Sequence, residues 1–523
     1  MIEKYLEKVK LNSLDDRNGF TITIGFFDGI HKGHQYILRE LRKHSFENNL
    51  YSAVISFDNE FLRLLKKTQS TLLTLEEKKK FLSFLGIDYL MILKFSQDII
   101  KLKPKEFIRE LLDNIDIKCI CVGENFRFGK DKQGDVNTLK ELGDLFGFKV
   151  RIFPLLKNND TLSSSSIRGL LEKGKVDEAK EKLGYYYFIR SKVIEGDKIG
   201  RSIGFPTANI EVPNKIIPSN GIYRGKVMVN EKFYKTAVYI GNKPTFNNPK
   251  GRIIEAHILD YQGDDLVDKE IEVIFQEFIR EERKFKNLDE LKEQIAKDVD
   301  YVRSYSEKVK GIITIDGPAG SGKTTVAKLL AKTLDYDYLD SGALYRAVAY
   351  MKIKENLNSN EDLISYLGKS PFKFFWDGEE FKVFYKDKDI SKIIRSDEIG
   401  RGASIVGTIK DVRDILTNMQ REFYKENKGL VIEGRDSGTY VFPNANLKIY
   451  LTANLEVRAK RRATELNEDY KKILESIKER DLKDSTRAVA PLKIPDDAFI
   501  IDTSYLSPKD VVLEIISLYL KVL

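Results

Sequence analysis

The chain has 523 residues, of which 42% are hydrophobic and 11% aromatic, values typical of globular proteins that bury several cores. No apolar run of 18 residues occurs, which excludes a membrane-spanning helix. The net charge of only +8, from 88 Lys and Arg against 80 Asp and Glu, argues against nucleic-acid binding. Charges in the N-terminal MIEKYLEKVK favour a cytoplasmic protein without an export signal.

Residues 20–155 alternate short apolar runs with stretches of helical periodicity, which predicts an α/β domain with a parallel sheet. The apolar runs are FTITIG, YSAVISF, YLMILKF, KCICVG and VRIFPL. Cys119 and Cys121 alternate along the fourth run, so we expect both thiols on one face of a buried strand. A reduced core pair fits them better than a metal site.

The stretch GFFDGIHKGH lies between the first of these runs and a helical segment, and it contains two of only four histidines. Backbone amides at a helix start bind phosphate, and imidazoles at i and i+3 lie on the same side. His31 and His34 are therefore candidates for donating hydrogen bonds to a nucleoside triphosphate attacked at its α-phosphorus. Two alternatives remain for these histidines: they form a metal-binding pair, or one is a turn residue and the other lies on the surface.

Together with VGENFRFG (122–129) and SSSSIR (163–168), this stretch resembles the HxGH nucleotidylyltransferases, specifically the FAD synthetase domain of bacterial bifunctional riboflavin kinase/FAD synthetases. The resemblance implies that residues 1–183 form a Rossmann-like domain that adenylylates FMN with ATP. It implies that His31 and His34 are catalytic and bind the ATP phosphates, and that Asn125 lies near the nucleotide and flavin ends. The implied cofactor-binding residues are Gly25, Asp28, Gly33, Asn125, Ser164, Ser165 and Arg168. The chain departs from the family at Ser166 and Lys132, where relatives often have Arg.

Residues 185–275 contain closely spaced β-type runs separated by Gly, Pro and Asn, and a helical segment follows. This pattern predicts a small antiparallel barrel closed by a helix. Its segment GDKIGRSIGFPTANI (196–210) lacks the glycine spacing of a dinucleotide fingerprint. With IPSNGIY, YIGNKPTF, EAHILDY and REERKFKNLDEL after it, the segment resembles riboflavin kinase, and we assign that domain to 184–305.

The resemblance to riboflavin kinase implies that Thr207 and Asn209 hold a Mg²⁺ that bridges the ATP phosphates. The loop with Gly204 and Pro206 would cover the nucleotide. Glu255 would accept the proton of the riboflavin 5′-hydroxyl as it attacks the γ-phosphorus, although its alternating strand alone also fits an outward polar residue. The two N-terminal domains would then catalyse consecutive steps.

After a linker at 306–310, the run GIITI predicts a strand, and IDGPAGSGKTT carries the P-loop pattern GxxxxGK[ST] before a helical stretch. Such a loop cradles phosphates with its backbone amides, while its lysine reaches the β- and γ-phosphates and its threonine hydroxyl contacts Mg²⁺. The predicted binding set is Gly317, Gly320, Ser321, Gly322, Lys323, Thr324 and Thr325.

The segments LDSGALYR, ASIVGTIKDVR, EGRDSGTYVFP and ERDLKDSTRAVAPL resemble cytidylate kinase, a P-loop NMP-kinase α/β fold, across 311–523. The resemblance implies catalytic roles for Lys323, Arg480 and Asp484. It implies a CMP or dCMP site made by Ser341, Tyr345, Arg346, Ser404, Arg413, Arg435, Asp436 and Arg487. A carboxylate suits the N4 amino group of cytosine and disfavours uracil.

Two further segments of the third domain carry structural predictions. Residues 371–390 predict a β-hairpin around Asp377 and Gly378. The basic segment RAKRRATEL (458–466) fits both a lid helix and a solvated surface, and the stretch 465–478 is shorter than in many relatives.

The leading hypothesis is a trifunctional enzyme that uses ATP and Mg²⁺ to convert riboflavin to FMN, FMN to FAD, and CMP or dCMP to its diphosphate. We expect these small molecules as partners, with no nucleic acid and no membrane. The alternative is that one domain, first or third, is a non-catalytic nucleotide-binding regulatory or assembly module. A narrower alternative keeps the enzyme class and changes the acceptor substrate of one domain. The first domain would then be a cytidylyltransferase, or the third domain would prefer UMP.

Overall fold

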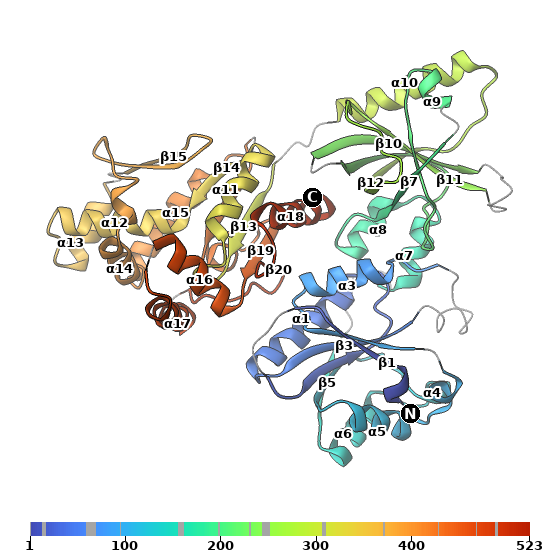
Figure 1. The fold of residues 1–523 in the computed structure, drawn as a ribbon, viewed down its shortest axis with the longest axis horizontal. Helices are drawn as coiled ribbons and strands as arrows, with labels where there is room; N and C mark the ends of the chain where they lie inside the picture. Colours follow the sequence, from blue (N-terminus) through green and yellow to red (C-terminus); the bar gives the residue numbers. More distant parts are fainter. Residues whose placement is uncertain are drawn as a thin grey trace. The chain divides into compact units, whose positions relative to one another are not determined.

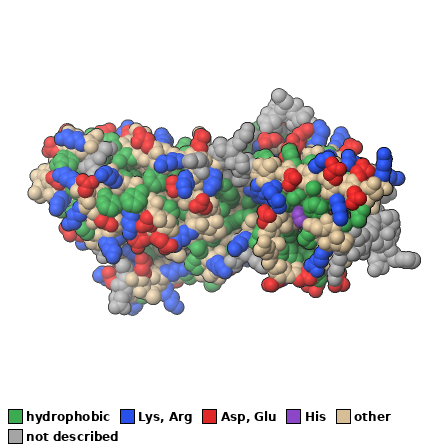
Figure 2. Space-filling view, turned by 90° about the horizontal axis from the view of Figure 1, so that it is seen from above, with side chains coloured by type: hydrophobic (Ala, Val, Ile, Leu, Met, Phe, Trp, Pro, Cys, Tyr) green, Lys and Arg blue, Asp and Glu red, His purple; other side chains and the backbone are tan. Residues whose placement is uncertain are grey.

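The computed structural model describes residues 2–12, 17–58, 70–94, 96–154, 162–196, 199–229, 232–242, 251–305, 310–369, 372–426, 428–466, 468–486 and 490–522. The chain forms two compact units, Met1–Ser306 with Leu520–Val522, and Glu307–Tyr519 with Leu523 (Figure 1). Among the described residues, no helix has both the length and the apolar character needed to cross a membrane. Lys and Arg side chains intersperse with Asp and Glu on the face shown in Figure 2.

The first unit begins with a six-stranded sheet in the order β1-β4-β3-β2-β5-β6. Its strands are β1 (Leu6–Lys10), β2 (Phe20–Ile24), β3 (Tyr51–Phe57), β4 (Tyr89–Leu93), β5 (Ile117–Gly123) and β6 (Lys149–Phe153). The five strands predicted from apolar runs, β2 to β6, are present and mutually parallel. Cys119 and Cys121 are buried free thiols on β5, as predicted. The antiparallel edge strand β1 was not predicted.

Helices and short turns connect these strands and lead out of the sheet. They are η1 (Ile2–Tyr5), α1 (Lys32–Glu47), α3 (Leu75–Phe84), α4 (Gln97–Lys101), α5 (Pro104–Asn114), η2 (Lys130–Lys132), α6 (Val136–Phe146), α7 (Ser164–Leu171) and α8 (Val176–Leu183). Helix α1 packs against β2, β3 and β5. Because β2 and β5 are parallel neighbours, their carboxyl ends meet at one edge of the sheet, where ligands of such folds bind.

A closed barrel with the strand order β10-β11-β8-β7-β12-β9 follows in the same unit and confirms the predicted antiparallel barrel. Its elements are β7 (Phe188–Ile194), α9 (Ile199–Ser202), β8 (Ala208–Ile210), β9 (Gly221–Val229), β10 (Lys232–Asn242), β11 (Arg252–Ile258), β12 (Glu270–Arg280) and α10 (Leu288–Ser304). Helix α10 packs on β9 and β10, and α8 packs on β12. The first sheet and the barrel are therefore joined through α8.

The second unit contains a parallel sheet in the order β14-β18-β13-β19-β20. Its strands are β13 (Ile312–Asp316), β14 (Asp337–Asp340), β18 (Leu430–Gly434), β19 (Leu447–Thr452) and β20 (Phe499–Asp502). The other elements are α11 (Lys323–Leu334), α12 (Ser341–Lys354), α13 (Asn360–Leu367), η3 (Ile393–Arg395), α14 (Asp397–Val406), α15 (Lys410–Phe423), η4 (Ser437–Val441), α16 (Leu455–Leu466), α17 (Tyr470–Thr486) and α18 (Pro508–Val522).

The predicted hairpin of the second unit is confirmed. Strands β15 (Phe372–Trp376) and β16 (Phe381–Tyr385) pair antiparallel, and β17 (Lys388–Asp389) extends them. Gly378 in the connection has φ +93°, and the Asp377 carboxylate accepts the backbone amides of Glu379 and Glu380. A left-handed glycine next to an acceptor of this kind is what a tight turn requires.

Candidate active sites

The two histidines of GFFDGIHKGH lie together at the start of α1. Their rings stack with centroids 3.7 Å apart, and His31 is the N-cap residue, whose Nδ1 accepts the His34 amide at 3.4 Å. A Cβ at Gly33 would lie 3.3 Å from the His31 ring, so glycine leaves room for the stack. The structure therefore brings both imidazoles to the positive end of a 16-residue helix, where anions bind.

Burial keeps both imidazoles neutral. Burial lowers the pKa of His31 to about 4. For His34, burial and then the neighbouring His31 and Lys78 lower the pKa well below its usual value. The Nδ1 atom of His34 is buried without a hydrogen-bond partner. A neutral imidazole still has one N–H to donate, so the pair can hydrogen-bond phosphate oxygens without carrying charge.

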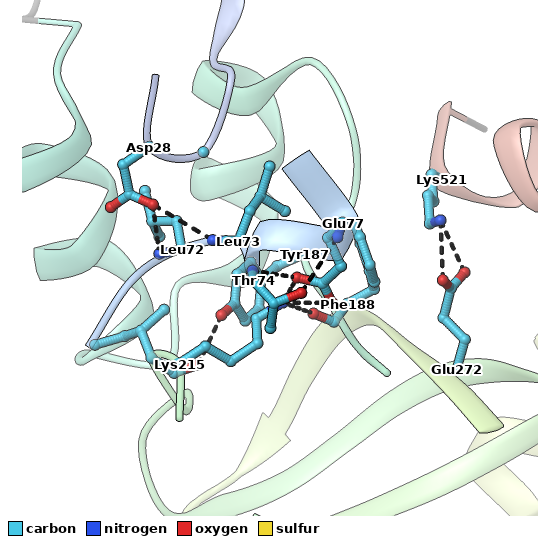
Figure 3. A network of polar contacts seen from close by, with 12 residues as sticks. Asp28, Leu72, Leu73, Thr74, Glu77, Tyr187, Phe188, Lys215, Glu272 and Lys521 are labelled. Atoms are coloured by element: carbon cyan, nitrogen blue, oxygen red, sulfur yellow. Dashed lines mark hydrogen bonds and ion pairs between the residues drawn. The ribbon is translucent and has the colours of Figure 1, made fainter. Parts of the chain in front are cut away.

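Asp28 is the centre of a network that holds this loop (Figure 3). Its Oδ1 accepts the amides of Leu72, at 2.8 Å, and Leu73, at 3.4 Å, and its Oδ2 pairs with Arg168. The Ser164 hydroxyl donates to the Asp28 carbonyl at 2.8 Å. The structure thus joins the first and third motifs of the domain, which lie 140 residues apart, through Asp28 and Arg168.

The remaining predicted residues of this site lie at the same edge of the sheet or on the surface. The Gly25 amide donates to Ile55 O at 3.0 Å, which fixes the loop start against β3. Asn125 is exposed in the turn after β5, beside the carboxyl end of β2, and Ser165 is exposed on α7. Ser166 caps its own helix by exchanging hydrogen bonds with Ser163.

In the barrel, two predicted residues, Glu255 and Asn209, face each other on adjacent strands. Glu255 of β11 is directly opposite Asn209 of β8 on one side and Tyr239 of β10 on the other. Residues that face each other in antiparallel strands share one face of the sheet, so these three side chains are neighbours. Thr207 lies directly before β8, two residues from Asn209.

The glycine-rich segment of the barrel packs closely on the predicted metal-binding residues. A Cβ at Gly196 would lie 1.9 Å from Asn209 Nδ2, and one at Gly200 would lie 3.2 Å from Thr207 Oγ1. The barrel therefore provides oxygen-bearing side chains under backbone that only glycine allows, which fits Mg²⁺ and a nucleotide. Gly204 has φ +94°, and the Pro206 carbonyl is 2.8 Å from His257 Nδ1.

The loop after β12 reaches this site through a tyrosine. The Tyr239 hydroxyl donates to Glu282 of the REERKF segment, and Asn220 donates to the same carboxylate at 3.3 Å. Burial and the bond to Glu282 raise the pKa of Tyr239. Tyr239 therefore ties the segment after β12 to the strand beside Glu255.

The P-loop of the second unit runs from the end of β13 to the start of α11, as predicted. Gly317 has φ +151°, and a Cβ there would lie 2.1 Å from Leu451 O, so only glycine fits. The Lys323 ammonium donates to Pro318 O at 2.7 Å, and the Ser321 hydroxyl donates to the same carbonyl at 3.0 Å. Burial and then Arg435 lower the pKa of Lys323 well below its usual value.

Carboxylates stand at the ends of the strands beside this loop. Asp316 accepts the amides of Ser437, at 2.9 Å, and Gly438, at 2.7 Å, and burial raises its pKa to about 6. Burial and then Asp340 raise the pKa of Glu433, which hydrogen-bonds Thr324. Thr324 and its neighbouring carboxylate are hard oxygen groups of the kind that Mg²⁺ and its waters contact. Gly320, Gly322 and Thr325 lie in the same loop and helix start.

Guanidinium groups converge next to the loop. Burial, and after it the neighbouring cations Arg435 and Arg346, lower the pKa of Arg480 to about 10. Arg435 Nε donates to Asp484 at 3.0 Å. Ser341 begins α12 and is buried. A dense set of cations is suited to a polyanionic substrate.

The predicted base-reading residues are partly assembled. Arg413, with 1% of its surface exposed, pairs with Asp436, and its guanidinium lies 5.4 Å from the centre of the Tyr345 ring. Ser404 lies on α14, and its exposed hydroxyl donates to Gly400 O at 3.3 Å. Arg413 donates to Gly407 O, just beyond the same helix. Arg487 lies outside the described residues.

Two buried cations near these sites were not predicted. Arg458, within the basic segment interpreted as lid or surface, is buried and donates to Ala319 O of the P-loop at 3.1 Å and to Asp481 at 2.6 Å. Lys78 of α3 donates to Phe26 O at 2.8 Å, and burial lowers its pKa to about 8. Neither contact has a local sequence signal, because each partner comes from a distant segment.

Together these sites define a class of protein, the enzymes that transfer phosphoryl or nucleotidyl groups from a nucleoside triphosphate. Three family models match the chain in order: FAD synthetase at residues 14–167, riboflavin kinase at 183–306 and cytidylate kinase at 313–521. The chain belongs to the bifunctional riboflavin kinase/FMN adenylyltransferase family in its N-terminal part and to the cytidylate kinase family in its C-terminal part.

Individual relatives cover both parts. A bifunctional riboflavin kinase/FMN adenylyltransferase of Buchnera aphidicola subsp. Schizaphis graminum is 37% identical over 57% of this chain and 96% of that protein. A cytidylate kinase of Caldicellulosiruptor bescii is 43% identical over 40% of this chain and 96% of that protein. A crystal structure described as a macrolide-efflux protein from Streptococcus pneumoniae has a TM-score of 0.51 at 28% identity, over 56% of this chain and 96% of that one, which supports the fold.

Proposed function

We propose that this chain carries out three ATP-dependent transfers: riboflavin to FMN, FMN to FAD, and CMP or dCMP to the corresponding diphosphate. The observation that supports the proposal is that predicted site residues lie together in each of the three family segments: His31 beside His34, Asn209 opposite Glu255, and Arg435 near Arg480. The domain limits 1–183, 184–305 and 311–523 are part of this proposal.

In the barrel, Glu255 accepts the proton of the riboflavin 5′-hydroxyl. The hydroxyl oxygen forms a bond to the γ-phosphorus of ATP, the bond from that phosphorus to the bridging oxygen breaks, and ADP leaves. Asn209, directly opposite Glu255 in the strand register, and Thr207 would hold Mg²⁺, which when bound would supply positive charge to the phosphates.

At the paired histidines, a phosphate oxygen of FMN attacks the α-phosphorus of ATP, FAD forms and pyrophosphate leaves. His31 and His34 donate hydrogen bonds to oxygens that gain charge in the transition state, and the start of α1 adds its backbone amides. Arg168, held by Asp28, contacts the triphosphate. No covalent enzyme intermediate is needed, because FMN supplies its own nucleophile.

In the second unit, a phosphate oxygen of CMP attacks the γ-phosphorus of ATP and ADP leaves. Lys323 contacts the donor phosphates, and Arg435 and Arg480 neutralise the transferring group. Asp484 orients Arg435 through its hydrogen bond. Asp436, which pairs with Arg413, accepts a hydrogen bond from the N4 amino group of cytosine.

The test is a mass-spectrometric product assay on the whole chain with ATP, Mg²⁺, riboflavin and CMP supplied together. We expect FMN, FAD and CDP. A segment that is only a nucleotide-binding regulatory or assembly module would bind its ligand and yield no product. If FMN, FAD or CDP is not formed, the proposal for the corresponding segment is overturned.

A single substitution tests the assignment of the barrel base. Glu255→Gln is expected to lower FMN formation about 10²- to 10⁴-fold, the usual contribution of a general base. FAD formation from supplied FMN should be unchanged. Glu270→Gln, which removes an exposed carboxylate paired with Arg190 on the same barrel, is the matched control. Equal rates of FMN formation in the two variants would contradict the role of Glu255.

A further inference from the structure

A buried ion pair joins the barrel to the first sheet within the first unit. The Lys215 ammonium, with a side chain 0% exposed, donates to both carboxylate oxygens of Glu77, at 3.1 and 2.9 Å. Its third hydrogen bond goes to Phe188 O at 2.9 Å. Lys215 comes from the loop between β8 and β9 of the barrel, whereas Glu77 lies in the first turn of α3 (Figure 3).

The surroundings fix the position of this ammonium. All three of its N–H donors have acceptors, and it lies 4.9 Å from the centre of the Tyr187 ring and 4.7 Å from that of Phe188. The Tyr187 hydroxyl donates to Ile216 O, the next residue along the chain, at 2.7 Å. A fully satisfied buried charge of this kind is costly to disturb and holds its partner in one geometry.

Glu77, held by Lys215, in turn fixes the segment 71–74 through hydrogen bonds with Thr74. The Glu77 carboxylate accepts the Thr74 amide at 2.8 Å, and the Thr74 hydroxyl accepts the Glu77 amide at 3.2 Å, which is a reciprocal capping box. Beside it, Thr71 forms a parallel bridge with Lys215, and the Ile216 amide donates to Thr71 O at 2.8 Å. The barrel therefore holds both ends of the segment.

The segment 71–74 in turn holds the adenylylation loop. The amides of Leu72 and Leu73 donate to Asp28 Oδ1, and Asp28 Oδ2 pairs with Arg168. The contacts therefore run without interruption from Lys215 through Glu77 and the segment 71–74 to Asp28 and Arg168, as Figure 3 shows up to Asp28.

We propose that Lys215, a residue of the riboflavin kinase barrel, is a positioning residue for FMN adenylylation, because it holds the segment that orients Asp28 and Arg168 toward ATP. The inference rests on the proposed function in one respect, the contact of Arg168 with the triphosphate. It predicts that a substitution within one enzyme segment changes the ATP affinity of the other.

Lys215→Met is the main test, in the full chain with both activities measured. We expect the KM for ATP in FAD formation from supplied FMN to rise about tenfold, because a small displacement of a phosphate-binding group weakens the complex. The KM for ATP in riboflavin phosphorylation should change by less than about twofold, because that site uses other residues. A role in folding alone would reduce both rates at unchanged KM and would overturn the proposal.

A double variant keeps the test valid if Lys215→Met folds poorly. In Lys215→Met/Glu77→Gln no charge is left unpaired, and the glutamine still accepts the Thr74 amide in the capping box. We expect thermal stability to return toward that of the unaltered chain while the KM for ATP in FAD formation stays raised. Return of that KM to its original value would overturn the proposal.

Two controls separate this inference from the proposed function. Lys175→Met removes an exposed ion pair with Glu178 in the same unit and should leave both KM values unchanged. Arg168→Lys should raise the KM for ATP in FAD formation. If it does and the Lys215 variants do not, the inference fails and the ATP site stands. If neither changes the KM, the assignment of Arg168 to ATP fails as well.

Discussion

The paired-histidine site and the P-loop site handle the same triphosphate with opposite electrostatics. At the first, burial holds the pKa of His31 at about 4, so the imidazoles are neutral, and the guanidinium of Arg168 is paired with Asp28. At the second, Arg435 and Arg480 lie close enough to lower the pKa of Lys323, and Arg435 also lowers the pKa of Arg480. The first relies on hydrogen-bond donors and a helix start, and the second on accumulated charge.

Both reactions bring an acceptor phosphate close to a phosphate of ATP, and the two sites offset the repulsion in different ways. In the second unit, several cations lie close together. Attack on the α-phosphorus leaves the charge of the departing pyrophosphate near a helix terminus, where backbone amides and neutral imidazoles stabilise it. The two sites should therefore respond differently to the removal of a single group.

Removal of the P-loop lysine should have the largest effect. Lys323→Met is expected to lower CDP formation about 10³-fold, because it deletes a buried cation that contacts the donor phosphates. FMN and FAD formation should be unchanged. The measurement is kcat for all three products from one preparation, and loss of all three would contradict separate sites.

Removal of one imidazole should cost less. His34→Ala is expected to lower FAD formation from supplied FMN about 10²-fold, because one preorganised donor is lost while the helix amides and His31 remain. Phe27, whose ring lies 4.9 Å from that of His34, packs on the emptied position, so Phe27→Leu is the control for packing. If His34→Ala and Phe27→Leu reduce kcat equally, His34 acts by packing alone.

Strands and motifs formed by neighbouring residues could be predicted from the sequence, whereas contacts between residues far apart in the chain could not. Strands β2 to β6 were predictable because buried parallel strands are continuous apolar runs, whereas β1 was missed because Glu7 and Lys8 make it a half-exposed edge strand. The helix-start histidines and the P-loop are local motifs. The contacts of Arg458 with Ala319, 139 residues apart, and of Lys215 with Glu77, 138 apart, have no local pattern.

The pair of Arg413 and Asp436 tests how the second unit selects its acceptor, CMP. Asp436→Asn is expected to lower the preference for CMP over UMP about tenfold in kcat/KM, because an amide can donate to the uracil carbonyl where the carboxylate cannot. It also leaves the buried Arg413 without its ion pair, so the second unit should lose thermal stability. Competition between CMP and UMP measures the first effect. Unchanged preference would remove Asp436 from base recognition.

The smallest effect is the titration of His31, which tests directly whether the first site is neutral. The pKa of His31 is lowered from 6.5 to about 4, so between those values the unfolded chain binds a proton that the folded chain does not. His31 therefore destabilises the fold as pH falls from 6.5 to 4, by up to about 3 kcal/mol. With only four histidines, ¹⁵N-histidine NMR can follow each ring, and His31→Asn assigns this one.

The same titration reports on the ligand. A bound triphosphate next to His31 favours the charged imidazolium, so saturation with ATP should raise the pKa of His31. Asp88 in the same unit has a pKa raised to about 6 by burial and changes stability in the opposite direction, so the ring resonance is a cleaner measure than unfolding. If the pKa of His31 lies near 6.5 without ATP, or does not change when ATP is added, the electrostatic contrast between the two sites is wrong.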